Sequence, residues 1–171
     1  MSEISRVFKT FIAYAKRPDL YPELGRKIIK NTVNRNNAFK GKETTNIWAS
    51  ERAMTQNEAV SKLFKLHELT FDTDFEEILS TAKKRETECP ITMGGAGALA
   101  LIYYACEFTK AQNVVQTGVA YGWSSLAALL SLKNRNGTLY SSDMTYLAQD
   151  GDQYVGYVVP ETSKNSWKLF R

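Results

Sequence analysis

Side chains that bind metals or form cross-links are scarce in this 171-residue chain. It contains two cysteines, Cys89 and Cys106, and a single histidine, His67. A structural zinc site takes four Cys, His or carboxylate ligands in closely spaced pairs, so this supply excludes a local zinc site of the usual kind. Two cysteines without a CxxC spacing also argue against a disulfide framework. We therefore expect no bound metal and a reducing, cytoplasmic location.

Long apolar runs and dense basic stripes are also missing. No run is long enough to cross a bilayer, and the first residues lack the apolar core and cleavage site of a signal peptide. The formal net charge is +4, with a sequence pI near 9.0. Lys and Arg are spread along the chain, with a modest concentration before residue 45, whereas nucleic-acid-binding proteins cluster them on one face. We expect neither a membrane nor a nucleic acid as partner.

The first half of the chain is predicted to be helical. Residues 3–16 place apolar side chains at i, i+3 and i+4, a pattern that fits a surface helix for a membrane or partner, or a helix packed on its own domain. We favour the second interpretation. Further helices are predicted at residues 21–33, 47–65 and 72–87, and the polar stretch 34–46 around Gly41 is predicted to be a loop.

Three polar residues in this half are candidates for local roles. Thr55 with Glu58 has the spacing of a capping box, in which each side chain bonds to the other residue's backbone N–H. Thr73 is a candidate N-cap for the helix at 72–87. His67 is lone, and a lone histidine is more often structural than catalytic.

The second half changes to an alternation of strands and helices. A glycine-rich turn at 93–97 leads into an apolar helix at 98–108. The predicted order after it is a strand at 113–117, a helix at 123–133, a strand at 138–142 and the start of a third strand at 167–170. The first and second strands are apolar enough for both faces of their sheet to be covered, as in a parallel α/β sheet.

A set of residues around the first strand's end points to a ligand. Gly118 and Gly122 allow close approach to the backbone, and Ser124 and Ser125 open a helix whose N–H groups and hydroxyls can hold an anion. Asp143 ends the second strand, where a carboxylate can accept both hydroxyls of a ribose. The pattern favours a nucleoside-containing cofactor over a βαβ unit whose glycines serve only the turn.

The segment Gln116–Ser125 resembles motif I of class I S-adenosylmethionine-dependent methyltransferases, especially their small-molecule O-methyltransferase branch. It contains neither the Gly-x-Gly-x-x-Gly nor the Walker pattern of other nucleotide sites. The resemblance implies S-adenosylmethionine as cofactor, with Gly118, Ala120 and Gly122 along its methionine part. Tyr121 and Trp123 would shape the turn, Ser124 and Ser125 would hold the carboxylate, Asp143 would bind the ribose and Met144 would lie near the adenine.

The resemblance also implies an α/β, Rossmann-like fold that is partial here. It predicts a helical N-terminal cap region at 1–89 and a cofactor-binding domain at 90–171 with about three parallel strands. The family's sheet has seven strands, so we expect a C-terminally truncated fold, with residues 114–117 at an exposed edge that could pair two copies. The family commonly has an acid where this chain has Gln116.

The expected activity is methyl transfer to a small-molecule acceptor, most simply a hydroxyl oxygen. The sequence offers no candidate for the catalytic base. Two alternatives stay open: a catalytically inactive, truncated cofactor-binding remnant, or an interaction module that keeps only the fold. A nucleotide-dependent oxidoreductase is disfavoured by the turn sequence, and a helical protein with an incidental βαβ unit ranks last.

Overall fold

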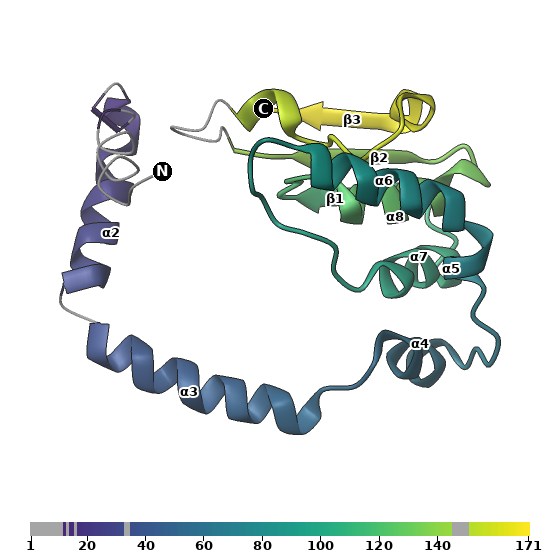
Figure 1. Ribbon diagram of the computed structural model, residues 1–171, viewed down its shortest axis with the longest axis horizontal. Coiled ribbons are helices and arrows are strands. Elements are labelled where there is room, and N and C mark those ends of the chain that lie inside the picture. The colour runs from purple at the N-terminus through teal and green to yellow at the C-terminus, as the bar shows by residue number, and fades with distance from the viewer. Residues whose placement is uncertain (1–11, 13, 16, 33–34, 145–150) are drawn as a thin grey trace. The chain divides into compact units, whose positions relative to one another are not determined.

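The chain forms two compact units in the computed structural model, which describes residues 12, 14–15, 17–32, 35–144 and 151–171. One unit consists of residues 1–54 with 147–149, and the other of residues 55–146 with 150–171. Figure 1 shows the sheet in the second unit. The division falls at Met54, well before the predicted boundary at 89/90, because Val60 and Phe71 share one hydrophobic core with the helices and strands that follow.

The described part of the first unit is helical. A 3-10 helix η1 (Pro18–Leu20) leads into α2 (Tyr21–Thr32), and α3 (Arg35–Arg52) follows. The predicted loop at 34–46 is therefore wrong for residues 35–46. The Thr45 hydroxyl donates to the Gly41 carbonyl at 2.7 Å, so this hydroxyl bonds within the helix, and one interior glycine costs only about 1 kcal/mol. Of the predicted helix at 3–16, only Ile12, Tyr14 and Ala15 are described, and all three are helical.

The second unit begins with a capped helix. Thr55 Oγ accepts the Glu58 N–H at 3.2 Å, and Glu58 Oε2 accepts the Thr55 N–H at 2.8 Å, so the predicted capping box is confirmed. It starts α4 (Gln56–Phe64) and separates that helix from α3. The helical stretch predicted at 47–65 is thus interrupted, and it starts again at the capping box.

Three more helices lead to the sheet: α5 (Phe71–Asp74), α6 (Glu76–Glu88) and α7 (Leu99–Phe108). The predicted helix at 72–87 is broken at Phe75, and Thr73 lies inside α5 and does not cap it. The Tyr104 hydroxyl of α7 takes over the capping, because it accepts the N–H groups of Thr70 at 2.8 Å and of Phe71 at 3.1 Å.

The sheet confirms the predicted fold class. It contains β1 (Asn113–Thr117), β2 (Thr138–Ser142) and β3 (Trp167–Phe170), all parallel and in the order β1-β2-β3. Helix α8 (Trp123–Lys133) connects β1 to β2, and two 3-10 helices, η2 (Gly151–Tyr154) and η3 (Glu161–Ser166), precede β3. Among the described residues β1 pairs only with β2, so β1 forms an edge, as predicted.

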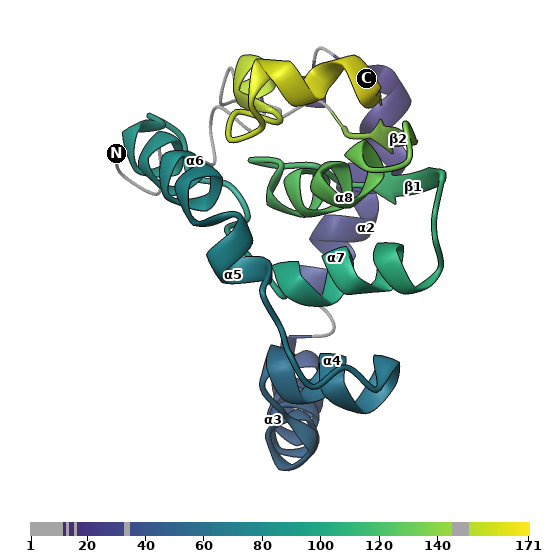
Figure 2. The same ribbon diagram turned by 90° about the vertical axis from the view of Figure 1, so that its right-hand side faces the viewer.

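Helix α8 is the centre of the core. It lies between α7 and the strands (Figure 2), and nine of its eleven residues are buried. This burial explains why its sequence is apolar all round and has no polar stripe. Leu126 and Leu132 of α8 are no more than 1% exposed, and so is Leu139 of the neighbouring strand β2.

One face of the sheet is covered and the other is open. Val114, Leu139 and Trp167 lie on the side of α8, whereas Val115 on the other side is 80% exposed and Phe170 is 58% exposed. The expectation that both faces are covered is therefore wrong within the described residues. Burial alternates from one residue to the next along β1 and β2, as expected for strands that are covered on one face.

Candidate functional site

The turn after β1 has a backbone that glycine makes possible. Gly118, Ala120 and Gly122 have φ angles of 77°, 51° and 94°, in the left-handed region that side chains disfavour. A Cβ on Gly122 would lie 2.9 Å from the Gly156 Cα and 2.9 Å from Val159 Cγ2. Gly122 therefore combines a left-handed conformation with close backbone contact, and these two demands exclude a side chain there.

Asp143 is bonded to this turn. Its Oδ2 atom accepts the N–H groups of Val119 at 3.0 Å and of Ala120 at 2.9 Å. The contact arises because β1 and β2 are parallel neighbours, so the residues that follow them meet at one edge of the sheet. The sequence predicted the proximity of Asp143 and the turn, but not that the carboxylate anchors the turn. Oδ1 accepts no hydrogen bond from any described residue.

A buried chain of polar side chains lies beneath the turn. Trp167 Nε1 donates to Ser141 Oγ at 2.9 Å, and the Ser141 hydroxyl donates to Gln116 Oε1 at 3.0 Å. Ser125 Oγ donates to the same Gln116 oxygen at 2.7 Å. The indole N–H can only donate, which fixes the direction of the chain and makes Gln116 Oε1 the acceptor at its end.

This chain changes the role expected for Ser125. Its side chain is 0% exposed and its hydroxyl is bonded to Gln116, so the predicted contact with a carboxylate falls to its backbone N–H at the helix N-terminus. Sequence analysis also missed Ser141 and Trp167. The available signal was a serine on the inward-facing positions of an apolar strand, since a buried hydroxyl needs a partner.

The N-terminus of α8 can still bind an anion through its backbone. Gly122 is the N-cap, and the first-turn N–H groups of Trp123, Ser124 and Ser125 have no partner within the helix. No acidic residue lies in this first turn, so the helix dipole is not neutralised there by a side chain. Trp123 is 4% exposed, and its Nε1 is buried without a hydrogen-bond partner among the described residues.

Two segments from other parts of the unit enclose the turn. The Tyr121 hydroxyl donates to the Ile91 carbonyl at 2.6 Å, and the Gly94 position lies beside Ala120. From the other segment, the N–H of Gly156 donates to the Ala120 carbonyl at 2.9 Å and that of Val158 to the Tyr121 carbonyl at 3.0 Å. These bonds hold the turn rigidly between the residues before α7 and those after η2.

The remaining predicted site residue is exposed. Met144 follows Asp143 and has 71% of its surface accessible, so its side chain is available to a ligand at this edge. Gly118, Ala120, Tyr121, Gly122, Trp123, Ser124, Ser125, Asp143 and Met144 thus gather around one turn and one strand end, and their contacts with a cofactor stay a prediction.

No group of Cys, His, Asp and Glu in the described ranges is arranged to hold a metal ion. No helix in the searched part of the chain is long and apolar enough to cross a membrane. Burial raises the pKa of the Cys106 thiol, and it also raises the pKa of the Tyr103 hydroxyl, with a further contribution from Glu107. Both groups lie on α7, so neither shift concerns the turn.

Comparisons with known proteins give distant likenesses to solved structures. No family model matches the sequence, and no curated protein matches it. A solved structure described as a "putative O-methyltransferase from Klebsiella pneumoniae" is similar with a TM-score of 0.38 and 13% identity, over 67% of this chain. The likeness spans 48% of that protein, or about half of its length.

Proposed function

We propose that this chain binds S-adenosylmethionine at the β1–α8 turn and takes part in methyl transfer to a small-molecule acceptor. The observation that carries the proposal is the Asp143 carboxylate, held by two N–H groups of a turn with three left-handed residues. This arrangement sets a carboxylate and the first turn of α8 at one strand edge, where doubly wound folds bind nucleotides.

The residues around the turn suit such a cofactor in three respects. The first-turn N–H groups of α8 would bind the carboxylate of the amino-acid part. Asp143 Oδ1, without a bond to the described residues, would accept hydroxyl hydrogens of the ribose. The exposed Met144 side chain would lie against the adenine. Gly118, Ala120 and Gly122 would present backbone without a long side chain in the way.

When bound, the cofactor supplies a methyl group on a positively charged sulfur. Transfer forms a bond between the acceptor atom and the methyl carbon and breaks the carbon–sulfur bond. If the acceptor is a hydroxyl, its proton must go to a base or to water. We assign no described side chain to that role, and the turn's contribution is to bind and orient the cofactor.

A second candidate is a cofactor-binding protein without turnover. It is favoured by the internal use of groups that a cofactor would otherwise engage: Ser125 Oγ bonds to Gln116, and Asp143 Oδ2 bonds to the turn. Gln116 adds no negative charge at the end of β1, so any contact it makes is that of a neutral amide. Both candidates require the same binding site and differ only in catalysis.

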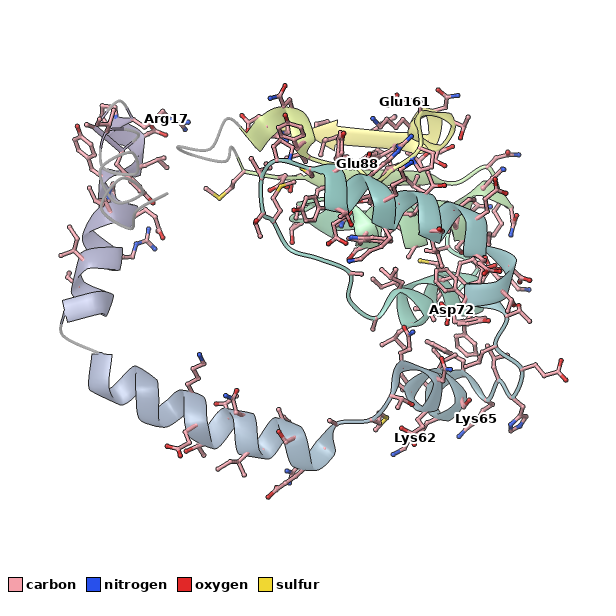
Figure 3. All side chains as sticks on the ribbon, in the orientation of Figure 1. Arg17, Lys62, Lys65, Asp72, Glu88 and Glu161 are labelled. Atoms are coloured by element: carbon pink, nitrogen blue, oxygen red, sulfur yellow. The ribbon has the colours of Figure 1, made fainter. Side chains whose placement is uncertain are left out.

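The first experiment is a calorimetric titration of the full chain with S-adenosylhomocysteine. We compare the wild type with Asp143→Asn, which keeps the shape and one acceptor oxygen for the turn. Asp72→Asn is the matched control, because Asp72 is an exposed acid on helix α5 and not at the turn (Figure 3). We expect saturable binding that Asp143→Asn weakens at least about tenfold, a loss of roughly 1.4 kcal/mol, while the control is unchanged.

Absence of binding to a folded wild-type chain would overturn the proposal. Equal affinity of the wild type and Asp143→Asn would show that the Asp143 carboxylate does not bind the ribose. Once binding is established, a screen of hydroxyl-bearing acceptors for S-adenosylhomocysteine release separates the two candidates, because only the enzyme forms that product.

A further inference from the structure

Strand β1 has one edge with no strand beside it among the described residues, since it pairs only with β2. Two hydrogen bonds show which of its backbone groups face β2. The Thr138 N–H donates to the Gln112 carbonyl at 2.7 Å, and the Gly118 N–H donates to the Ser142 carbonyl at 2.8 Å. Because backbone groups alternate in direction along a strand, the even-numbered residues bond to β2. The odd-numbered residues of β1 therefore direct their N–H and C=O groups to the free edge.

Three residues, Asn113, Val115 and Thr117, carry these edge-facing groups. All three are exposed, and Val115 is 80% exposed. No described residue forms a hydrogen bond with the N–H and C=O groups that these residues turn to the edge. A row of unpaired backbone donors and acceptors is a template on which another strand can pair.

The β1 edge lacks the features that usually prevent such pairing. Edge strands are ordinarily protected by charged side chains, by proline or by a bulge. The sequence of β1, Asn-Val-Val-Gln-Thr, contains no charge and no proline, and its register with β2 is continuous. The opposite edge of the sheet differs, because β3 carries Lys168 and is followed by Arg171. Positive charge therefore protects the β3 edge, whereas the side chains of β1 do not oppose a second strand.

We propose that two copies of this chain pair along β1, antiparallel to each other, around a two-fold axis at Val115. Under this symmetry Val115 faces Val115 of the second copy, and Asn113 faces Thr117 of the second copy. Each facing pair exchanges two N–H···O=C bonds, so the edge-facing donors and acceptors of both copies are satisfied. The two three-stranded sheets then join into one continuous sheet. Pairing along β1 requires no cofactor and is separate from the proposed methyl transfer.

A second copy fits this edge because the edge is complementary to itself. The two-fold axis places every donor of one copy opposite an acceptor of the other, and the uncharged side chains bring no like charges together. Val115 contacts its own counterpart, and Asn113 and Thr117 form a polar pair. A partner that is recognised by charge has no charged side chain to contact on β1. The association expected is weak and reversible, because an edge of five residues buries less area than a stable dimer needs.

The test is analytical ultracentrifugation of the full chain over a range of concentrations. We expect the wild type to show a reversible equilibrium between monomer and dimer. Val115→Lys should weaken association at least about tenfold, because it sets two positive charges opposite each other at the axis, and Val115→Glu should do the same with negative charges. An equimolar mixture of the two variants should associate again, because opposite charges then meet. Circular dichroism verifies that the variants stay folded, as expected at so exposed a position.

The matched control is Phe170→Lys, which adds the same charge at an exposed apolar position on the same face of the sheet, but on β3. This control should associate like the wild type, because the β1 edge is unchanged. A wild type that stays monomeric at every concentration would overturn the proposal, and so would a dimer that survives Val115→Lys. Loss of the dimer in Phe170→Lys would assign the contact to the open face, and failure of the mixed variants to associate would exclude the two-fold register at Val115. Either result would also overturn it.

Discussion

The described parts of the two units differ in how far their apolar side chains are buried. In residues 55–171 they converge on α8, where Leu126 and Leu132 are almost fully buried. In the described part of residues 1–54, Ile28, Ile29 and Trp48 are more than half exposed. A helix as short as the twelve-residue α2 is marginal in water on its own, whereas α8 gains its stability from burial on nearly every side. Within the described residues, helices of similar length are therefore packed to very different degrees.

Removal of a large core side chain should give the largest difference between the units. Leu132→Ala takes away a side chain that is 0% exposed, and we expect a loss of about 2–5 kcal/mol in the free energy of unfolding. Ile29→Ala, at a site 58% exposed, should change it by less than about 0.5 kcal/mol. Urea unfolding followed by tryptophan fluorescence measures both, and equal losses would show that α2 is packed in a core.

The same substitution at two glycines should act in opposite directions. Gly156 has a φ of 75°, and an added Cβ would come within van der Waals overlap of the Trp167 ring, so Gly156→Ala should cost about 1–3 kcal/mol. Gly41 lies inside α3 with nothing within 4 Å of an added Cβ, and Gly41→Ala should raise helix content and stabilise that helix by about 1 kcal/mol. Thermal unfolding and circular dichroism report the two effects, and a destabilising Gly41→Ala would contradict the helical assignment of residues 35–46.

The polar chain under the turn offers a more local comparison. Gln116→Met leaves the buried hydroxyls of Ser125 and Ser141 without their acceptor, and we expect a cost of about 2 kcal/mol. Adding Ser125→Ala removes one of those hydroxyls, so the double variant should be less destabilised than the sum of the single changes. Strict additivity in denaturant titrations would mean that the two side chains are not coupled.

The smallest expected effect is a pH dependence confined to the second unit. Burial raises the pKa of the Cys106 thiol above its ordinary value of 9.0. Above that value the unfolded chain loses the proton first and the folded chain keeps it, so the free energy of unfolding falls as pH rises. Below it the contribution is constant. Cys106→Ala should reduce the slope of stability against alkaline pH, with Cys89→Ala as control, and an unchanged slope would exclude the thiol as its cause.

The strands could be predicted to the residue because their local signals agree. The segments 113–117 and 138–142 both have Asn or Gly turn signals at their ends. A strongly apolar helix separates the two segments. The helix over residues 35–46 could not be predicted, because its polar residues suit a loop equally well and the sequence does not say which backbone the Thr45 hydroxyl will bond.

The site was predictable only as far as it depends on strand order. Gly118, Gly122 and Asp143 meet because parallel strands end at the same edge, which the βαβ pattern already implies. The Trp167–Ser141–Gln116 chain depends on the register of β3 against β2, and residue spacing across an irregular connection does not fix that register. The open sheet face was missed for a related reason, since apolar content alone does not distinguish one covered face from two.

The irregular connection before β3 has a consequence for the order of folding. Helix α8 shortens the distance that the chain must search before β1 meets β2, while no α-helix lies in the described part of the connection from β2 to β3. Loop closure is slower when the intervening chain has no regular structure of its own. We therefore expect β1, α8 and β2 to assemble first and β3 to pair with β2 last. The contact between the Trp167 ring and Gly156 would form in that last step. Pulsed hydrogen exchange during refolding would then protect the amides of β2 that face β1 before those of β3.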